Sequence, residues 1–197
     1  CFEPSSQQEA YDMVHYAFDY SERIHLPILM RVTTRMAHSR AVVKIRENPR
    51  EQNAINFDAK SSEWVLLPAM ARRRNDIVTS QQTELEKDTV ESRFNVYTDG
   101  DNHSLGIITG GIGINYLNEC YPDGCPYPVL KISHYPLPKA LIRKITEECD
   151  NVLVVEEGQP FIEDALNGIM PGNAVIKGKP TGDLPRTGEL TPDIVKE

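Results

Sequence analysis

The chain has 197 residues, of which 40% are hydrophobic and 25% are charged, and its formal net charge is -8. This composition is that of a globular protein, with enough residues to bury one large core or two small ones. The negative charge argues against a nucleic-acid or anionic-membrane surface, and no run of about 18 apolar residues predicts a membrane span. Because the chain begins at Cys1 with neither Met nor a signal segment, we expect a piece of a longer, cytoplasmic polypeptide.

The first part of the chain predicts a helix, a strand and a polar turn. Ser6 followed three residues later by Glu9 is a capping-box pattern that marks a helix start. Apolar residues at helical spacing then predict a buried face made of Ala10, Met13, Val14, Ala17 and Phe18. Leu26 to Val32 reads as a strand, and hydroxyl, cationic and imidazole groups follow it from Thr33 to Arg40. That stretch is either a functional site or a solvated turn in which Arg35 and Arg40 pair with surface carboxylates.

The middle of the chain predicts a boundary between two folded parts. Residues 47–62 are polar and lack any apolar period, so they indicate a loop. Trp64 to Leu67 is a short apolar run, and residues 69–91 favour a helix with a thin apolar stripe, which is typical of helices that bridge domains. Arg72 to Arg74 on this helix indicate a solvated face rather than a phosphate cradle. We therefore predict a first α/β domain over 1–62, a linker helix region over 63–96 and a second α/β domain over 97–197.

The second domain shows an α/β rhythm. Short apolar runs alternate with helical segments, and the runs are Leu105 to Thr109, Val129 to Ile132, Val152 to Val155 and Ala174 to Ile176. Strands that are apolar nearly throughout predict a parallel sheet covered by helices on both faces. Ligands of such sheets bind beyond the carboxyl ends of the strands.

The turns after these strands hold the candidate ligand residues. Gly110, Gly111 and Gly113 stand where a dinucleotide fingerprint would stand, but Tyr116 replaces its third glycine. The glycines still permit a ligand or another backbone to approach the following helix. His134 is predicted to be a hydrogen-bonded turn residue. Glu156 and Glu157 are adjacent, so we expect them to point to opposite sides, with one accepting from the amides of the following helix. We predict that Gly110 to Gly113, His134 and Glu157 lie near one another at one edge of the sheet.

No metal site is predicted from the residue spacing. Asp99-Gly100-Asp101-Asn102 precedes a strand rather than following one, which indicates a turn and not a magnesium-diphosphate site. The four cysteines match neither a zinc nor an iron-sulfur pattern. Cys120 and Cys125 flank a turn, where a loop-closing disulfide, half a metal site and two reduced thiols are all compatible with the spacing.

Several segments resemble the α subunits of indolepyruvate:ferredoxin oxidoreductases, within the 2-oxoacid:ferredoxin oxidoreductase family. They are Glu3 to Tyr11, Leu26 to Arg35 with His38 to Arg40, Tyr135 to Pro138, Val154 to Pro160, and Gly182 to Pro185 with Gly188 to Leu190. The resemblance implies the C-terminal half of a thiamine pyrimidine-binding domain, followed by a transketolase-C-terminal-like, mostly parallel α/β domain with an extended C-terminal arm. It also implies oxidative decarboxylation of aryl pyruvates to acyl-CoA and CO2.

The resemblance further implies thiamine diphosphate, Mg2+ and [4Fe-4S] clusters in the parent enzyme, with none bound by this chain alone. The implied partners are a β subunit in a hetero-oligomer, ferredoxin, CoA and the aryl pyruvate. Thr33, Thr34, Arg35 and His38 fall where the pyrimidine-binding domain would face the active site. Two other interpretations stay open: a stand-alone α/β module that binds a nucleotide or acyl-CoA at Gly110 to Gly113, and a subunit-interaction domain.

Overall fold

A computed structural model describes residues 1–47, 54, 65, 67–167, 174–179, 181–185 and 190–196. Its centre is a five-stranded sheet in the order β1-β3-β2-β4-β5. The strands are β1 (Val96–Thr98), β2 (Gly106–Gly110), β3 (Val129–Ile132), β4 (Asn151–Val155) and β5 (Val175–Lys177). β3, β2, β4 and β5 are parallel, and only β1 runs antiparallel to its neighbour β3. The prediction of a mostly parallel α/β domain is therefore confirmed.

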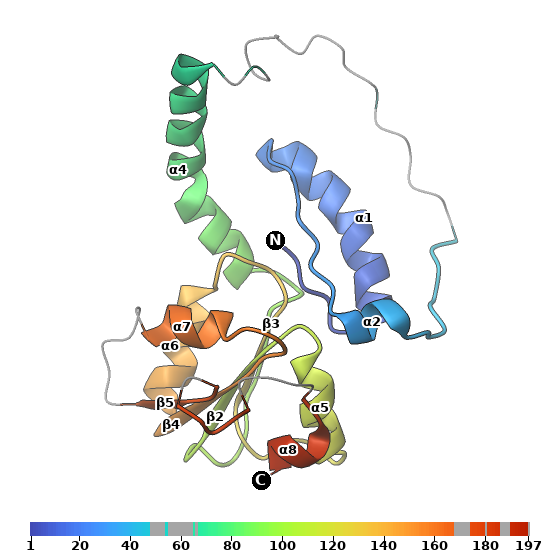
Figure 1. Ribbon diagram of the computed structural model, residues 1–197, viewed down its shortest axis with the longest axis vertical. Coiled ribbons are helices and arrows are strands. Elements are labelled where there is room, and N and C mark those ends of the chain that lie inside the picture. The colour runs from blue at the N-terminus through green and yellow to red at the C-terminus, as the bar shows by residue number, and fades with distance from the viewer. Residues whose placement is uncertain are drawn as a thin grey trace.

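Helices cover both faces of the sheet, as the apolar strands predict (Figure 1). α5 (Gly113–Cys120) and α8 (Pro192–Lys196) lie on one face, and α6 (Lys139–Glu148) and α7 (Phe161–Asn167) lie on the other. Successive strand residues point to opposite faces. Ile107 accordingly packs in the α5 core with Tyr116, while Ile108 packs in the α6 core with Ile142. All five residues of β2 are buried, because this strand lies in the middle of the sheet.

The N-terminal part consists of α1 (Gln7–Ile24) and α2 (Thr34–His38), followed by the long helix α4 (Pro68–Val90). α1 begins as predicted, since the Ser6 hydroxyl accepts from the Glu9 amide at 3.1 Å. The Glu9 carboxylate closes the cap by accepting from the Ser5 amide at 2.7 Å. These two bonds satisfy amide groups that have no partner within the helix.

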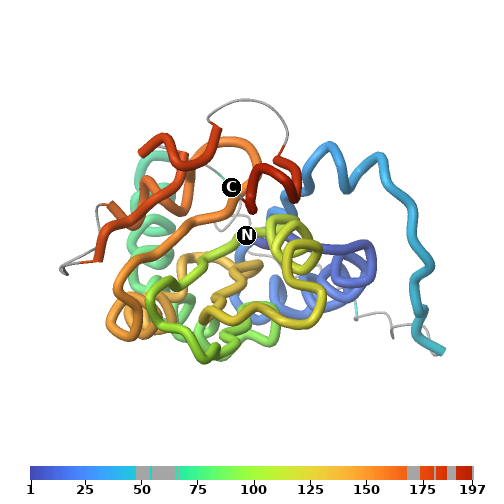
Figure 2. Tube along the Cα trace, turned by 90° about the horizontal axis from the view of Figure 1, so that it is seen from below, coloured from blue at the N-terminus to red at the C-terminus, as the bar shows by residue number. Residues whose placement is uncertain are grey.

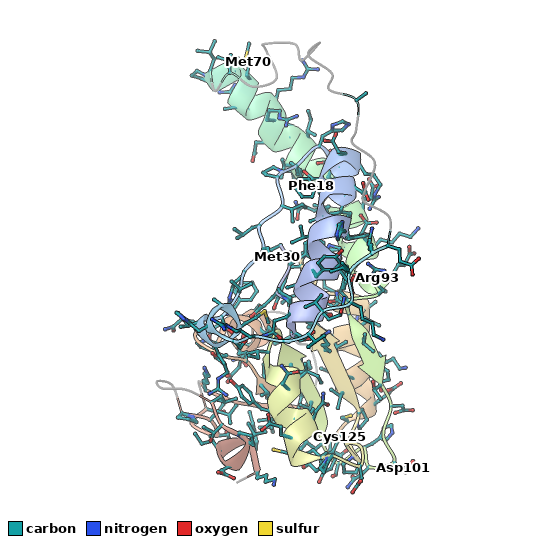
Figure 3. All side chains as sticks on the ribbon, turned by 90° about the vertical axis from the view of Figure 1, so that its right-hand side faces the viewer. Phe18, Met30, Met70, Arg93, Asp101 and Cys125 are labelled. Carbon is teal, nitrogen blue, oxygen red and sulfur yellow. The ribbon has the colours of Figure 1, made fainter. Side chains whose placement is uncertain are left out.

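The predicted buried face of α1 is only partly correct. Met13 is buried, but Val14 and Phe18 are 43% and 60% exposed. The buried side runs instead through Met13, Tyr20 and Ile24, because these side chains pack around the ring of Phe2 and form an aromatic cluster with Tyr16 and Phe94. The side of α1 that carries Tyr16 and Tyr20 faces inwards, because both rings lie edge-on to Phe2. Figure 3 shows Phe18 on the outer side of α1.

Leu26 to Val32 is extended but does not form the predicted strand. Within the described part of the chain, its one ladder contact is a parallel bridge between Met30 and Phe2. The Phe2 amide donates to the Leu29 carbonyl and the Arg31 amide donates to the Phe2 carbonyl, each at 2.8 Å. A strand needs a neighbour with several consecutive residues, and the described residues offer this segment only Phe2 on that side.

α4 contacts both α1 and α6. Near its C-terminal end it contacts α1 through Asp88, which accepts from Arg23 at 2.7 Å, and it reaches α6 through Lys139 and Glu86, 2.5 Å apart. Thr89 is the one buried residue of α4. The helix therefore buries only a thin stripe of its surface, as predicted. Arg72 and Arg73 are exposed, as predicted. Trp64 and most of residues 47–62 lie outside the described residues, so the predictions made for them stay predictions.

Candidate functional site

The topology places a switch point between the carboxyl ends of β2 and β4. These strands are parallel neighbours in which Thr109 pairs with Val155. The chain leaves β2 towards α5 on one face, and it leaves β4 towards α7 on the opposite face. Loops that diverge in this way leave a gap at the sheet edge, which is where open α/β sheets bind their ligands. We call this place the switch-point crevice.

The N-terminal segment fills the switch-point crevice with the side chain of Glu3. Glu3 is only 5% exposed. A Cβ placed on Gly111 would lie 2.6 Å from the Glu3 Cγ atom, so no larger residue fits there. Gly111 also has a φ of +49°, a conformation that favours glycine. The close approach that the glycines were predicted to permit is therefore used by the chain itself.

Two side chains bind the Glu3 carboxylate. The Tyr135 hydroxyl donates to Oε2 at 3.1 Å, and Arg31 Nη2 lies 3.4 Å from Oε1. Arg31 also donates to the carbonyl of Glu157 at 3.2 Å, so it links the N-terminal segment to the loop after β4. Burial raises the pKa of Glu3, although Arg31 and the Tyr135 hydrogen bond act in the opposite direction. Burial also raises the pKa of Tyr135.

Glu156 and Glu157 point to opposite faces, as predicted. The Glu156 carboxylate accepts from the amides of Ile162 and Glu163 at 2.9 and 3.2 Å, at the start of α7. Glu157 accepts from the Tyr116 hydroxyl of α5 at 2.5 Å. Burial raises the pKa of Glu156, and its bonds to the α7 amides oppose that effect. One carboxylate thus fixes each of the two helices that border the crevice.

Lys179 and Glu163 form a second buried polar group beside the loop after β4. The Lys179 ammonium donates to the Gly158 carbonyl, and the side chain is 3% exposed. Burial lowers the pKa of Lys179. Burial also raises the pKa of Glu163, whose Oε1 atom has no hydrogen-bond partner among the described residues. Sequence patterns do not indicate either residue, because each lies in a segment with no motif of its own.

His134 differs from its predicted role as a hydrogen-bonded turn residue. Its backbone does bind Asn95, whose Oδ1 accepts from the His134 amide at 2.8 Å. The ring, however, is fully buried and stacks on Phe2 with centroids 4.4 Å apart. Neither ring nitrogen has a partner in the described part of the chain. The ring therefore serves as an aromatic surface that receives the N-terminal segment, and burial lowers its pKa to about 4.

The comparisons with known proteins agree on one type of subunit. No family model matches the chain. "Indolepyruvate oxidoreductase subunit IorA" of Methanothermobacter thermautotrophicus is 33% identical, with 99% of this chain and 32% of the relative covered. The same subunit of Archaeoglobus fulgidus is 34% identical (95% and 30% covered), and that of Pyrococcus horikoshii is 31% identical (96% and 31% covered). The chain is a homologue of one part of the IorA subunits.

This chain spans about a third of the length of the IorA relatives it matches. These relatives are subunits of an oxidoreductase by name. A solved structure of 2-oxoglutarate:ferredoxin oxidoreductase from Magnetococcus marinus has a TM-score of 0.47 and 16% identity, covering 66% of this chain and 23% of that one. Within the described residues, no helix combines the length and the apolar content that a membrane crossing needs.

The predicted substrate-side residues of this IorA homologue lie on α2 and just before it. Thr33 caps α2, because its hydroxyl accepts from the Met36 amide at 3.4 Å. Arg35 lies over the ring of Tyr116, 5.1 Å from its centre, and so links α2 to α5. Thr34 and His38 are exposed. The structure thus brings Arg35 close to the Tyr116–Glu157 pair at the crevice.

The predicted glycine and glutamate candidates meet at one sheet edge. A Cβ on Gly110 or Gly111 would come within 4 Å of Glu3, whereas one on Gly113 would meet Thr109 and the Val155 carbonyl, so the glycine there lets α5 approach the sheet. Glu157 lies beside them through Tyr116. Sequence reasoning did not predict that Glu3, Arg31 and Tyr135 interact with one another. All three lie within the segments that carry the family resemblance. Those segments were the only signal that could have identified them.

The residues present do not fit the sites of the cofactors that the resemblance implies. A diphosphate-bound Mg2+ needs free carboxylate and amide oxygens. Here Asp99 Oδ1 accepts from the Gly100 amide and Asn102 Oδ1 from the Ser104 amide, in a turn at the edge of the sheet away from the crevice; Figure 3 labels Asp101 of this turn. Across the described residues, no three potential metal ligands come together. Cys120 and Cys125 are free thiols, so the predicted alternative of a disulfide between them is not realised.

Proposed function

We propose that this chain forms a scaffold portion of a thiamine-diphosphate-dependent indolepyruvate:ferredoxin oxidoreductase, which oxidises aryl pyruvates to acyl-CoA and CO2. The observation that carries the proposal is 31–34% identity to several IorA subunits along 95–99% of the chain. Thiamine diphosphate, Mg2+ and [4Fe-4S] clusters would be bound outside the described residues. The β subunit, ferredoxin and CoA would be its partners in a cytoplasmic hetero-oligomer.

The geometry of the crevice supports a structural rather than a catalytic part. Glu3, Arg31 and Tyr135 tie the first residues of the chain to the sheet through a hydrogen bond and an ion pair in which Glu3 is buried and Arg31 is exposed. Such a contact fixes the position of α1 and α2 relative to the sheet. The α2 residues Thr34, Arg35 and His38 would thereby be held at the side from which a substrate approaches.

The decisive experiment is a ferredoxin- or viologen-linked assay with indolepyruvate, CoA and thiamine diphosphate. We expect no turnover by the chain alone, and turnover by the full-length subunit together with its partner subunit. The physical reason is that the chemistry needs the thiamine ring, the metal-bound diphosphate and an electron relay to be positioned together. Robust turnover by the chain alone would refute the scaffold proposal.

A second candidate, a nucleotide- or acyl-CoA-binding module, is disfavoured by Glu3. A carboxylate buried against Gly111 occupies the space next to the α5 amino end and repels phosphate. Thermal unfolding with ATP, NAD or CoA tests this candidate directly. A rise in the midpoint with ligand concentration would favour the binding module, and an unchanged midpoint would favour the scaffold.

A further inference from the structure

Residues 39–46 form an extended segment that follows α2 and runs along the outer margin of the molecule, light blue in Figure 2. We call residues 41–46 the basic edge. Two of its apolar side chains are unusually exposed, Val42 at 98% and Ile45 at 76%. Isolated exposed apolar residues are common on protein surfaces, so their exposure alone indicates nothing. What distinguishes the basic edge is how its backbone is held.

Side chains of α1 bind one side of this backbone in the way that a neighbouring strand would. The side-chain amide of Gln8 accepts from the Lys44 amide at 2.7 Å and donates to the Lys44 carbonyl at 3.2 Å. Two residues further on, the Arg46 amide donates to the Tyr11 hydroxyl at 3.0 Å. The spacing of two is that of a strand, in which alternate residues turn their backbone groups to the same side. α1 thus holds the segment in a strand-like conformation.

The opposite side of the basic edge carries the backbone groups of Ala41, Val43 and Ile45. Among the described residues, no hydrogen bond involves the backbone of these three positions. An extended, unpaired and apolar edge is a template for the addition of another strand. Because α1 already orders the backbone, strand addition would lose less conformational entropy than it would from a flexible loop.

Charge decides which strand fits. Residues 40–46 contain three cations, Arg40, Lys44 and Arg46, and no carboxylate, and all three are exposed. A second copy paired antiparallel about Val43 would place Arg40 directly opposite Arg46 of that copy, and like charges in such pairs are destabilising. A strand with carboxylates at alternate positions would face the cations instead. We propose that the basic edge is a strand-addition site for an acidic, extended segment of a partner polypeptide.

The conformational part of this proposal is tested on the chain alone by amide hydrogen exchange. Lys44 and Arg46 donate to α1, so their amides are expected to exchange at least about threefold more slowly than those of Val43 and Ile45, in line with one exposed hydrogen bond each. Equal rates at all four positions would mean that α1 does not hold an edge, and would overturn the proposal.

The binding part is tested by an NMR titration with a capped hexapeptide in which Glu and Val alternate, beside a control peptide with Lys in place of Glu. We expect saturable shifts confined to residues 41–46 with the acidic peptide, at least about fivefold weaker binding at high salt, and no saturable shifts with the basic peptide. Equal binding of both peptides, or none of the acidic one, would overturn the proposal. The proposal would also be overturned if the chain formed a dimer and Val43→Pro abolished it, because the basic edge would then bind a second copy of the chain.

Two variants separate backbone pairing from side-chain contact. Val43→Pro removes an outward amide that has no hydrogen-bond partner among the described residues, whereas Val43→Ala keeps that amide. We expect the proline variant to bind the acidic peptide at least about fivefold more weakly, and the alanine variant to bind it like the wild type. Lys44→Glu leaves the backbone unchanged and is also expected to abolish binding of the acidic peptide. This second variant keeps the test valid if the proline disturbs the conformation of the segment. Unaltered binding by both Val43→Pro and Lys44→Glu would contradict strand addition.

Discussion

His134 makes the docking of the N-terminal segment sensitive to acid. Burial lowers its pKa to about 4 in the folded chain, below the ordinary value of 6.5. A base with a lowered folded pKa contributes its full stability above pH 6.5 and loses it as the pH falls from there towards about 4. The difference of roughly 2.5 pKa units corresponds to about 3 kcal/mol between those limits. Protonation would place a charge beside Phe2, where the described residues offer no hydrogen-bond partner to either ring nitrogen.

We therefore predict that the stability of His134→Phe, relative to the wild type, is higher at pH 5 than at pH 8. A phenyl ring keeps the stacking on Phe2 and cannot be protonated, so the variant should gain about 2 kcal/mol on the wild type as the pH falls from 8 to 5. Urea unfolding at both pH values measures it. The exposed His38→Phe change is the control and should leave the pH dependence unaltered. A His134→Phe variant that follows the wild-type curve would show that the ring is not buried as described.

Glu3 has the opposite dependence. Burial raises the pKa of Glu3, so ionising its carboxyl costs more in the folded chain than in the unfolded chain, and stability falls as the pH rises through the folded pKa. Glu156 and Glu163 shift in the same direction, so only a comparison of variants isolates Glu3. Glu3→Gln removes the ionisation, so its stability relative to the wild type should improve as the pH rises from 4 to 7.

Urea unfolding across that pH range measures the difference for Glu3→Gln. Glu147→Gln, at an exposed position of α6, is the matched control and should give a constant difference. The amide also loses the ion pair with Arg31, so an offset at all pH values is expected alongside the slope. A stability difference between Glu3→Gln and the wild type that does not change with pH would contradict a buried Glu3 carboxyl with a raised pKa.

At the scale of elements, the start of α1 rests on a local cap. The Ser6 hydroxyl and the Glu9 carboxylate satisfy backbone amides of the first turn. We expect Ser6→Ala to lower the free energy of unfolding by about 1 kcal/mol, as loss of a serine cap does in other proteins. Urea unfolding measures it. Ser80→Ala on α4, whose hydroxyl only bonds the Ile77 carbonyl within its own helix, should change stability by less than about 0.5 kcal/mol.

At the scale of the whole molecule, the two folded parts are predicted to meet near residues 60–95. The polar, aperiodic composition of residues 47–62 and the thin buried stripe of α4 both support this boundary. Trypsin should then cleave first between Arg46 and Arg93, where Arg72 and Arg73 are exposed, because cleavage needs a segment that can leave its packing at low cost. Intact mass analysis of the first products locates the cut. A first cleavage between Leu105 and Ile176 would contradict the boundary.

The sequence by itself determined the four parallel strands of the sheet. Apolar runs over residues 105–109, 129–132, 152–155 and 174–176 predicted four strands whose bounds differ from the observed ones by no more than one residue at either end. Such runs are informative because a strand buried on both faces cannot include many polar residues. β1 was not predicted, since it is a three-residue edge strand with an exposed, polar surrounding. The start of α1 was predictable for the same local reason, because its cap involves residues three apart.

Only the tertiary structure decided what fills the switch-point crevice and which face of α1 is buried. The contact of Glu3 with Tyr135 joins residues 132 positions apart, and that of Arg31 with the Glu157 carbonyl joins residues 126 positions apart. No local pattern encodes such contacts, because they depend on where the fold brings distant segments together. The same holds for Leu26 to Val32, which has the composition of a strand but forms, among the residues that the structure describes, one bridge to Phe2. Composition sets which conformations a segment can adopt, and the neighbours that it meets select one of them.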